Sequence, residues 1–195
     1  MNKRLLRTTT IATITASLVL APASAMADGG AAPGDTPPPV VSLPGKPQVP
    51  GSKVVVKGGL AYAPAAAPEV VKQIVWAGNT IRNKPYIYGG GHALYVYDKI
   101  AKAAKLAKGY DCSGSVSFAL HGAGLLNIPL VSGSFATWKK AAKGPGEWVT
   151  IYANGGHVFM TVAGARFDTS GANPSRWQMS MRSGSGYAIV HPIGL

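Results

Sequence analysis

The sequence predicts an α+β fold, in which N-terminal helices pack on a mostly antiparallel β-sheet. Two apolar segments with helical spacing come first, one at 69–79 directly after Pro68 and one beginning at Cys112. Residues 129–146 are expected to be irregular. Four short segments rich in β-branched and aromatic residues follow, at 147–153, 157–163, 166–170 and 186–193. Because these strands follow the helices instead of alternating with them, an antiparallel sheet is favoured.

Residues 1–27 predict a secretory signal peptide. Lys3, Arg4 and Arg7 precede an apolar run that ends at Leu20, and small residues follow up to Ala27. The run is shorter than the ~20 residues that a membrane-spanning helix requires. We therefore expect cleavage after Ala27 and a secreted or cell-wall-associated protein, with a retained N-terminal anchor as the alternative.

Residues 28–68 differ in composition from the rest of the chain and predict an extended linker. They contain nine prolines among many glycines and alanines, and such a segment cannot bury enough apolar area to fold alone. The run SKVVVKGG within it is a candidate strand that docks onto the domain. Residues 69–195 are expected to form one folded domain, because that length suffices for one hydrophobic core.

The chain is strongly basic, with a formal net charge of +12 from 19 basic and 7 acidic residues. Removal of the signal peptide, which holds three basic residues and no acidic ones, leaves +9. Such a charge favours nucleic acid, acidic lipid headgroups or the anionic polymers of a cell envelope. No nucleic-acid-binding module is recognisable, and export favours the envelope.

Four lysines spaced three residues apart predict a short basic amphipathic helix: Lys99, Lys102, Lys105 and Lys108. Its ordinary interpretation is a solvated face. The alternative is contact with anionic cell-wall polymers. No large exposed apolar stripe is evident in the sequence, so we expect a monomer.

The single cysteine, Cys112, lies in the stretch GYDCSGSVSFALHGAGLL. An unpaired cysteine in an exported protein is an intermolecular bridge, an inert core residue or a reactive thiol. Asp111 is a suitable N-cap, which places Cys112 at the first helical position. The macrodipole of the helix favours a thiolate there, and the charge of Asp111 opposes this unless its carboxylate is engaged in capping.

A nucleophilic thiolate requires a base, and His157 is the best-placed of the four histidines. It opens the strand segment HVFMTVA after the flexible ANGG. His121 lies on the same helix as the thiol, displaced along it. His92 follows the glycine triplet, from which the site is within reach, but surface or structural roles are expected for His92 and His191. Asp168 in RFDTS is the candidate that orients the imidazole.

The turn between these two strands decides whether Asp168 reaches His157. With Ala163 and Gly164 at the turn, Asp168 lies opposite Phe159, on the face that carries His157 and within side-chain reach. A turn one residue later places it opposite Thr161, too far for contact. The sequence leaves both registers open.

Two further features bear on the site. The triplet in KPYIYGGGH has no strand and no G-x-G-x-x-G spacing around it, so its glycines are expected to let the backbone pass close to another element. Ser113 and Gly114 are expected to be close-packing residues. No metal site is expected, because the histidines lack ligand spacing and one cysteine cannot form a thiolate cluster.

The segments PYIYGGG, YDCSGSVSFALHGAGLL, GGHVFMTVAG and RFDTSG, in this order, resemble the NlpC family of bacterial cell-wall cysteine peptidases over residues 69–195. The resemblance implies a compact, papain-like fold with Cys112 as nucleophile, His157 as general base and acid, and Asp168 as the orienting residue. It also implies that Tyr86, Ser113 and the backbone amide of Cys112 bind the substrate or the oxyanion.

The activity implied by the resemblance is hydrolysis of peptidoglycan stem peptides through an acyl-thioester, without metal or cofactor. The alternatives are an amidase of the related cysteine-histidine class, which cuts between sugar and peptide, and a non-catalytic cell-wall binding protein. The sequence departs from the family in its third residue, more often histidine, in its lysine-rich segment and in the strand before His157. These departures bear on substrate specificity.

Overall fold

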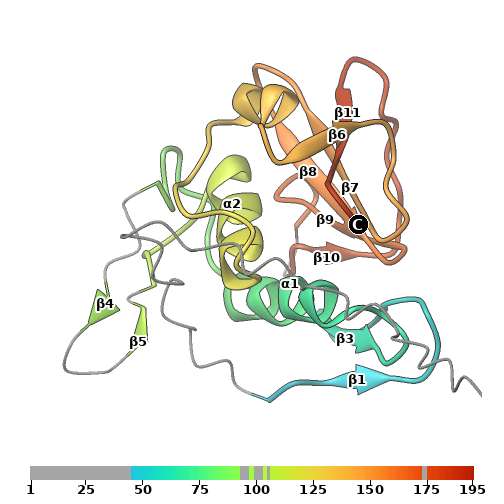
Figure 1. The fold of residues 1–195 in the computed structure, drawn as a ribbon. Helices are drawn as coiled ribbons and strands as arrows, with labels where there is room; N and C mark the ends of the chain where they lie inside the picture. Colours follow the sequence, from blue (N-terminus) through green and yellow to red (C-terminus); the bar gives the residue numbers. More distant parts are fainter. Residues whose placement is uncertain (1–44, 93–96, 99–102, 105, 173–174) are drawn as a thin grey trace, which may run out of the picture. The chain divides into compact units, whose positions relative to one another are not determined.

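The structure is a computed structural model that describes residues 45–92, 97–98, 103–104, 106–172 and 175–195 (Figure 1). The predicted signal peptide and the first part of the predicted linker lie outside these residues. Within the described part of the chain, no helix has the length and apolar character needed to cross a membrane.

Two helices form the centre of the domain. α1 spans Glu69–Ile81 and α2 spans Cys112–Gly122, and both begin where the sequence predicts. α1 packs on α2, and α2 packs on strand β8 (Val158–Val162). Because α2 lies between a helix and a sheet, all of its first ten residues are buried, which is more than the single apolar stripe predicted.

A six-stranded sheet, antiparallel throughout, forms the second half of the domain (Figure 1), in the order β10-β9-β8-β7-β11-β6. The α+β class with an antiparallel sheet is therefore confirmed. The four predicted strands are present in shorter form, together with two unpredicted edge strands: β6 (Ala141–Lys143), β7 (Val149–Ala153), β8, β9 (Ala165–Phe167), β10 (Trp177–Gln178) and β11 (Ala188–Pro192). The segment expected to be irregular holds β6 and a 3-10 helix, η1 (Ser132–Thr137).

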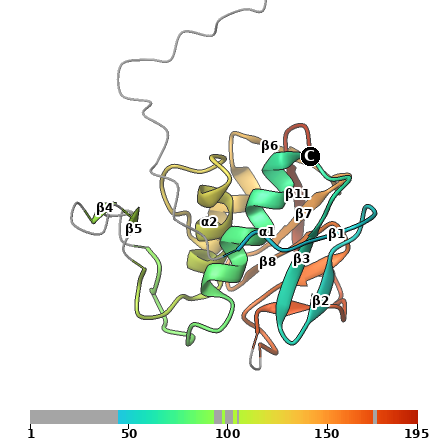
Figure 2. The same ribbon diagram turned by 90° about the horizontal axis from the view of Figure 1, so that it is seen from below.

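Part of the predicted linker is folded, which corrects the expected boundary at residue 68. Three short strands form a sheet in the order β1-β3-β2: β1 (Gln48–Val49), β2 (Val55–Lys57) and β3 (Leu60–Pro64). Figure 2 shows β3 alongside α1, and the two elements are in contact. The Asn79 amide bonds both the N–H and the C=O of Ala61, at 3.0 and 2.8 Å. Small side chains such as Ala61 and Ala63 thus become fully buried, a burial that composition does not reveal.

The prediction of a lysine-rich helix is wrong at those of its residues that the structure describes. Tyr97–Asp98 (β4) and Ala103–Ala104 (β5) pair as antiparallel strands. A helix of this length is marginal in water unless a face packs on other elements, and tyrosine favours strands. Lys99, Lys102 and Lys105 lie outside the described residues, and Lys108 is exposed.

Candidate active site

Cys112 occupies the first position of α2, with Asp111 as its N-cap. Through Oδ1 the Asp111 carboxylate accepts a hydrogen bond from the Gly114 N–H at 2.7 Å, and through Oδ2 it accepts one from the Gly89 N–H at 3.0 Å. The carboxylate is thus engaged in capping, as the thiolate hypothesis requires. The same two bonds tie the turn before the helix to its first turn. Cys112 is 8 % exposed.

The segment PYIYGGG, residues 85–91, is called here the aromatic-glycine turn, and it crosses the first turn of α2 at very short range. A Cβ built on Gly114 would lie 2.1 Å from the Gly90 carbonyl oxygen, a separation that real atoms do not adopt. The Asp111 N–H donates to the same carbonyl at 3.1 Å. The predicted close approach of the glycine triplet is therefore confirmed, and Gly114 supplies part of the room.

His157 is held at the start of β8 by the turn that precedes it. Asn154 Oδ1 accepts hydrogen bonds from the N–H groups of Gly156 and His157, at 3.0 and 2.9 Å. The imidazole packs near the rings of Phe159 and Tyr187, with centroids 6.3 and 6.4 Å away. Backbone and ring contacts together fix the position of the imidazole.

The β8–β9 hairpin adopts the first of the two predicted registers. It turns at Ala163 and Gly164, with φ angles of 46° and 88°, the positive values that a tight two-residue turn needs. Met160 pairs with Phe167, so the next residue, Asp168, comes level with Phe159. Its Oδ1 accepts a hydrogen bond of 2.8 Å from His157 Nε2.

The Cys112 thiol and the His157 imidazole lie close enough for each to shift the pKa of the other. Because Nε2 binds Asp168, Nδ1 is the ring nitrogen that faces the sulfur. The structure therefore brings together all three residues that the sequence singled out for chemistry, from the start of α2, the start of β8 and the end of β9.

The pKa values of Cys112 and Asp168 are lowered, and the pKa of His157 is raised. Burial raises the pKa of Cys112, but hydrogen bonds from His157 and the Val158 N–H, with the charge of His157, bring it below its usual 9.0. The hydrogen bonds to Asp168 and Cys112 raise the pKa of His157 to about 9. Burial also raises the pKa of Asp168, yet its hydrogen bonds lower it overall. The lowered pKa of Cys112 and the raised pKa of His157 both favour a thiolate–imidazolium pair over a neutral thiol and imidazole.

These shifts predict the pH dependence of thiol alkylation. The thiolate persists at every pH above the lowered pKa of Cys112, and its imidazolium partner persists up to about pH 9. An ordinary thiol is less than about 1 % ionised at pH 6. Between pH 6 and pH 8, we expect the rate of reaction of Cys112 with iodoacetamide to fall with pH less steeply than that of free cysteine. A rate that falls tenfold per pH unit over this range, as for free cysteine, would contradict the ion pair.

A pocket of about 430 Å³ opens over Cys112. Its lining comes from the aromatic-glycine turn, the start of α2, the start of η1 and the β7–β8 turn. Tyr86 lies at this pocket, as predicted, and is 56 % exposed. Burial and the charges of Cys112 and Asp111 raise its pKa. Ser113 also lines the pocket, and its hydroxyl donates to Asp111 Oδ1 at 3.1 Å.

The other histidines divide into two groups. His92 lies at the pocket, where Nε2 is 3.0 Å from both Asp111 Oδ1 and Ser113 Oγ, so its place is closer to the chemistry than expected. His121 and His191 each bind a backbone carbonyl through Nδ1, and for His191 this fits the structural role expected of it. The described residues contain no group of three His, Cys, Asp or Glu side chains arranged for a metal ion.

The sequence predicts no role for two arginines that lie at the site. Arg182 Nη1 donates to Asp168 Oδ2 at 3.1 Å. Arg176 is buried, and it donates to Ser115 Oγ at 2.9 Å and to the carbonyl of Tyr110 at 3.1 Å. It also donates to carbonyl groups at the end of α1 and just beyond it. Arg176 therefore links the end of α1 to α2 and to the residue that precedes Asp111. Neither arginine lies in a motif, and no local pattern marks them.

No protein-family model and no curated protein matches the sequence. Among solved structures, the chain is similar to the peptidoglycan hydrolase RipB from Mycobacterium tuberculosis, at 26 % identity and a TM-score of 0.46, over 64 % of this chain and 65 % of that one. It thus spans about two thirds of the length of that RipB chain.

Two further solved structures show a comparable likeness. The P60 domain of an antigen from M. avium subspecies paratuberculosis matches at 22 % identity and a TM-score of 0.46, over 64 % of this chain and 95 % of that one. A mutated form of the resuscitation promoting factor interacting protein RipA matches at 18 % identity and a TM-score of 0.44, over 79 % and 97 %.

Proposed function

We propose that the protein is an exported peptidoglycan hydrolase of the NlpC family, an endopeptidase that cleaves stem-peptide bonds with Cys112 as nucleophile. The observation that carries the proposal is the series Cys112–His157–Asp168 beside an open pocket, in which His157 interacts with the thiol and donates a hydrogen bond to the Asp168 carboxylate. A cysteine kept only for packing needs neither a lowered pKa nor a histidine that is itself bound to a buried carboxylate.

Acylation uses the ion pair directly. The Cys112 thiolate attacks the carbonyl carbon of the scissile bond, and the carbonyl oxygen takes up the negative charge. The backbone N–H of Cys112, which has no acceptor within its own helix because it lies in the first turn, is the assigned oxyanion donor. Tyr86, at the rim of the pocket, contacts the bound peptide. The C–N bond then breaks, and the proton on the His157 imidazolium passes to the leaving amine.

Deacylation reverses the roles of His157. The neutral imidazole removes a proton from a water molecule, whose oxygen attacks the thioester carbonyl. The C–S bond breaks, the acid product leaves, and the thiolate–imidazolium pair is restored. Throughout both steps Asp168 keeps the ring in one orientation and stabilises its charged form.

The setting of the reaction follows from the remaining features of the chain. The predicted signal peptide directs the protein to the cell envelope, and the net charge of the mature chain favours the anionic polymers found there. Lys99, Lys102, Lys105 and Lys108 are the lysines assigned to such contact. We assign a monomer, acting without metal or cofactor.

Digestion of purified peptidoglycan tests the proposal. Wild type, Cys112→Ala and Cys112→Ser are incubated with the polymer, and the released fragments are identified by mass spectrometry. We expect peptide fragments with new amino termini from wild type and none from either variant. The serine variant is the matched control, because it replaces the thiol with a hydroxyl of similar size that cannot supply a thiolate.

Three outcomes would contradict the proposal in different ways. Equal product release by all three proteins would exclude Cys112 as the nucleophile. Freed lactyl ends, in place of new amino termini within the peptide, would identify an amidase. Sedimentation of all three proteins with peptidoglycan and no release by any would favour a binding protein.

A further inference from the structure

We infer that Arg182 is a positioning residue of this enzyme, which fixes the carboxylate plane of Asp168 and thereby the ring orientation of His157. The inference rests on the proposed roles of Cys112, His157 and Asp168. Arg182 lies in the loop between β10 and β11, outside every segment that the sequence marks for function.

The Asp168 side chain is fully buried, at 0 % exposure, and its two oxygens have different partners. Oδ1 accepts from His157 Nε2 and from the Ser170 N–H, both at 2.8 Å. Oδ2 accepts from Arg182 Nη1 at 3.1 Å. Arg166 Nε lies 3.7 Å from Oδ2, beyond hydrogen-bond range, and its guanidinium bonds Gln178. Among the described residues, Arg182 is thus the hydrogen-bond donor to Oδ2.

A buried carboxylate without this donor would keep one unsatisfied oxygen, which is costly. It would also be free to rotate, because the terminal torsion of aspartate has a broad energy profile. Donors on opposite oxygens remove that freedom. The direction of the bond from Asp168 Oδ1 to His157 Nε2 is then set, and with it the direction in which Nδ1 faces Cys112.

Arg182 is itself held in place by the aromatic rings that pack near His157. Its guanidinium lies over Phe159 and Tyr187, 5.1 and 5.7 Å from the ring centroids. The two rings meet edge to face at 5.3 Å, and Phe159 stacks on Tyr152 at 4.6 Å. Although the Arg182 side chain is 32 % exposed, the rings and the carboxylate restrict it to one arrangement.

Alkylation of Cys112 tests the inference without any use of peptidoglycan. The chain has one cysteine, so iodoacetamide reports on this thiol alone. The rate is measured against pH for wild type, Arg182→Met and Arg182→Gln, two neutral replacements of similar length and different polarity, so that one can serve if the other does not fold. Without Arg182, Asp168 protonates at a higher pH, the imidazolium loses its acceptor there, and the thiolate is lost with it. The acid limb of the profile is the pH range in which the alkylation rate falls as the pH is lowered. We expect this acid limb to move up by about one pH unit.

Turnover and rescue complete the test. With peptidoglycan as substrate, kcat of Arg182→Met is expected to fall about tenfold at an unchanged KM, because the ring is misplaced but the pocket is intact. Arg182→Lys keeps the charge, and its acid limb is expected to return most of the way to the wild-type position. No restoration would overturn the inference.

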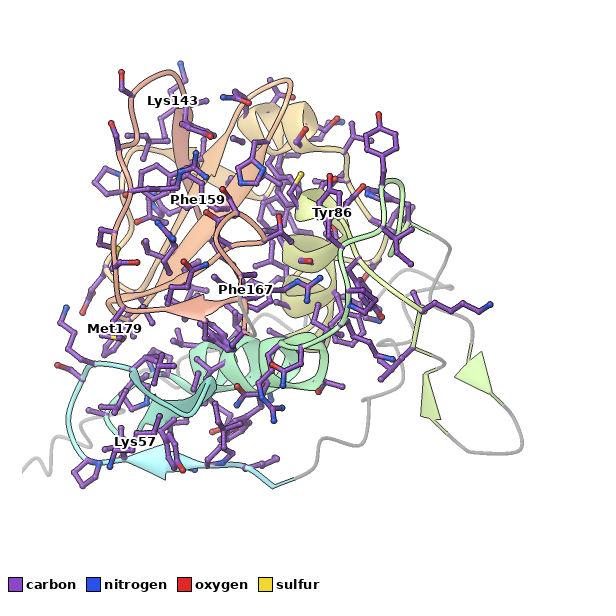
Figure 3. All side chains as sticks on the ribbon, turned by 180° about the vertical axis from the view of Figure 1, so that it is seen from behind. Lys57, Tyr86, Lys143, Phe159, Phe167 and Met179 are labelled. Carbon is purple, nitrogen blue, oxygen red and sulfur yellow. The ribbon has the colours of Figure 1, made fainter. Side chains whose placement is uncertain are left out.

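Lys57→Met is the matched control for charge. Lys57 is an exposed residue of β2, at the opposite end of the view in Figure 3 from Phe159. An acid limb of Arg182→Met that coincides with that of Lys57→Met would overturn the inference, as would a raised KM with an unchanged alkylation profile, which would make Arg182 a substrate-binding residue. A shifted limb in a protein that releases nothing from peptidoglycan would keep the positioning role and remove the proposed substrate.

Discussion

Replacement of His157 by alanine is expected to lower kcat about 10³- to 10⁴-fold. The variant loses the group that protonates the leaving amine and later activates water. It also loses the interaction and the positive charge of His157 that lower the pKa of Cys112. Burial, which raises this pKa, is then opposed mainly by the Val158 N–H. The thiol is then protonated at neutral pH. Turnover on peptidoglycan and the alkylation rate at pH 7 measure the two losses separately.

His191→Ala is the matched control for this prediction. His191 lies in β11, and its Nδ1 is 3.0 Å from the carbonyl oxygen of Gly144, so it serves the sheet and not the site. We expect kcat of this variant to equal that of wild type. If His157→Ala kept more than about a tenth of wild-type turnover, a role as general acid and base would be excluded.

Replacement of Gly114 by alanine is expected to destabilise the fold by about 2–3 kcal/mol and to reduce activity even where the protein remains folded. The new Cβ would lie 2.1 Å from the Gly90 carbonyl oxygen, a backbone atom that cannot turn aside as a flexible side chain would. The aromatic-glycine turn must therefore move away from α2. That movement lengthens the bonds from Gly89 to Asp111 and from Asp111 to Gly90 and displaces Tyr86 from the pocket.

Thermal and denaturant unfolding measure the loss of stability of Gly114→Ala, and turnover below its melting temperature measures the loss of activity. Gly133→Ala in η1 is the control, because a Cβ there meets its nearest atoms at the ordinary distances of 3.7 and 3.9 Å. We expect its stability to stay the same or to rise by up to about 1 kcal/mol. Equal stability of the two alanine variants would show that the turn yields without cost.

The parts of the fold that the sequence predicts well are those set by neighbouring residues. α1 and α2 begin where Pro68 and Asp111 indicate, because caps act within one helical turn. The strands β7, β8, β9 and β11 lie in segments that carry enough β-branched and aromatic residues to be predicted. The two missed strands, AAK in β6 and WQ in β10, contain no β-branched residue and one aromatic residue between them. Their existence depends on β11 and β9, the strands beside them.

The candidate site divides in the same way. Cys112, His157 and Asp168 are visible because the thiol stands at a capped helix start, the histidine at a strand start and the aspartate one hairpin away. The hairpin register was left open, and packing selected the turn at Ala163. That choice requires a positive φ at an alanine, which local preference does not favour.

By itself, the sequence determined the class of fold and the two helices, and it predicted the nucleophile and its two partners, since each depends on contacts within a few residues or on one hairpin. Only the tertiary structure decided the rest. It folded residues 48–64 onto α1, brought His92 to the pocket, and placed Arg176 and Arg182 on groups far from them in the chain. Such contacts are selected by the burial of polar groups that need partners. That selection acts on whichever residue the fold brings near and therefore leaves no pattern in the order of the residues.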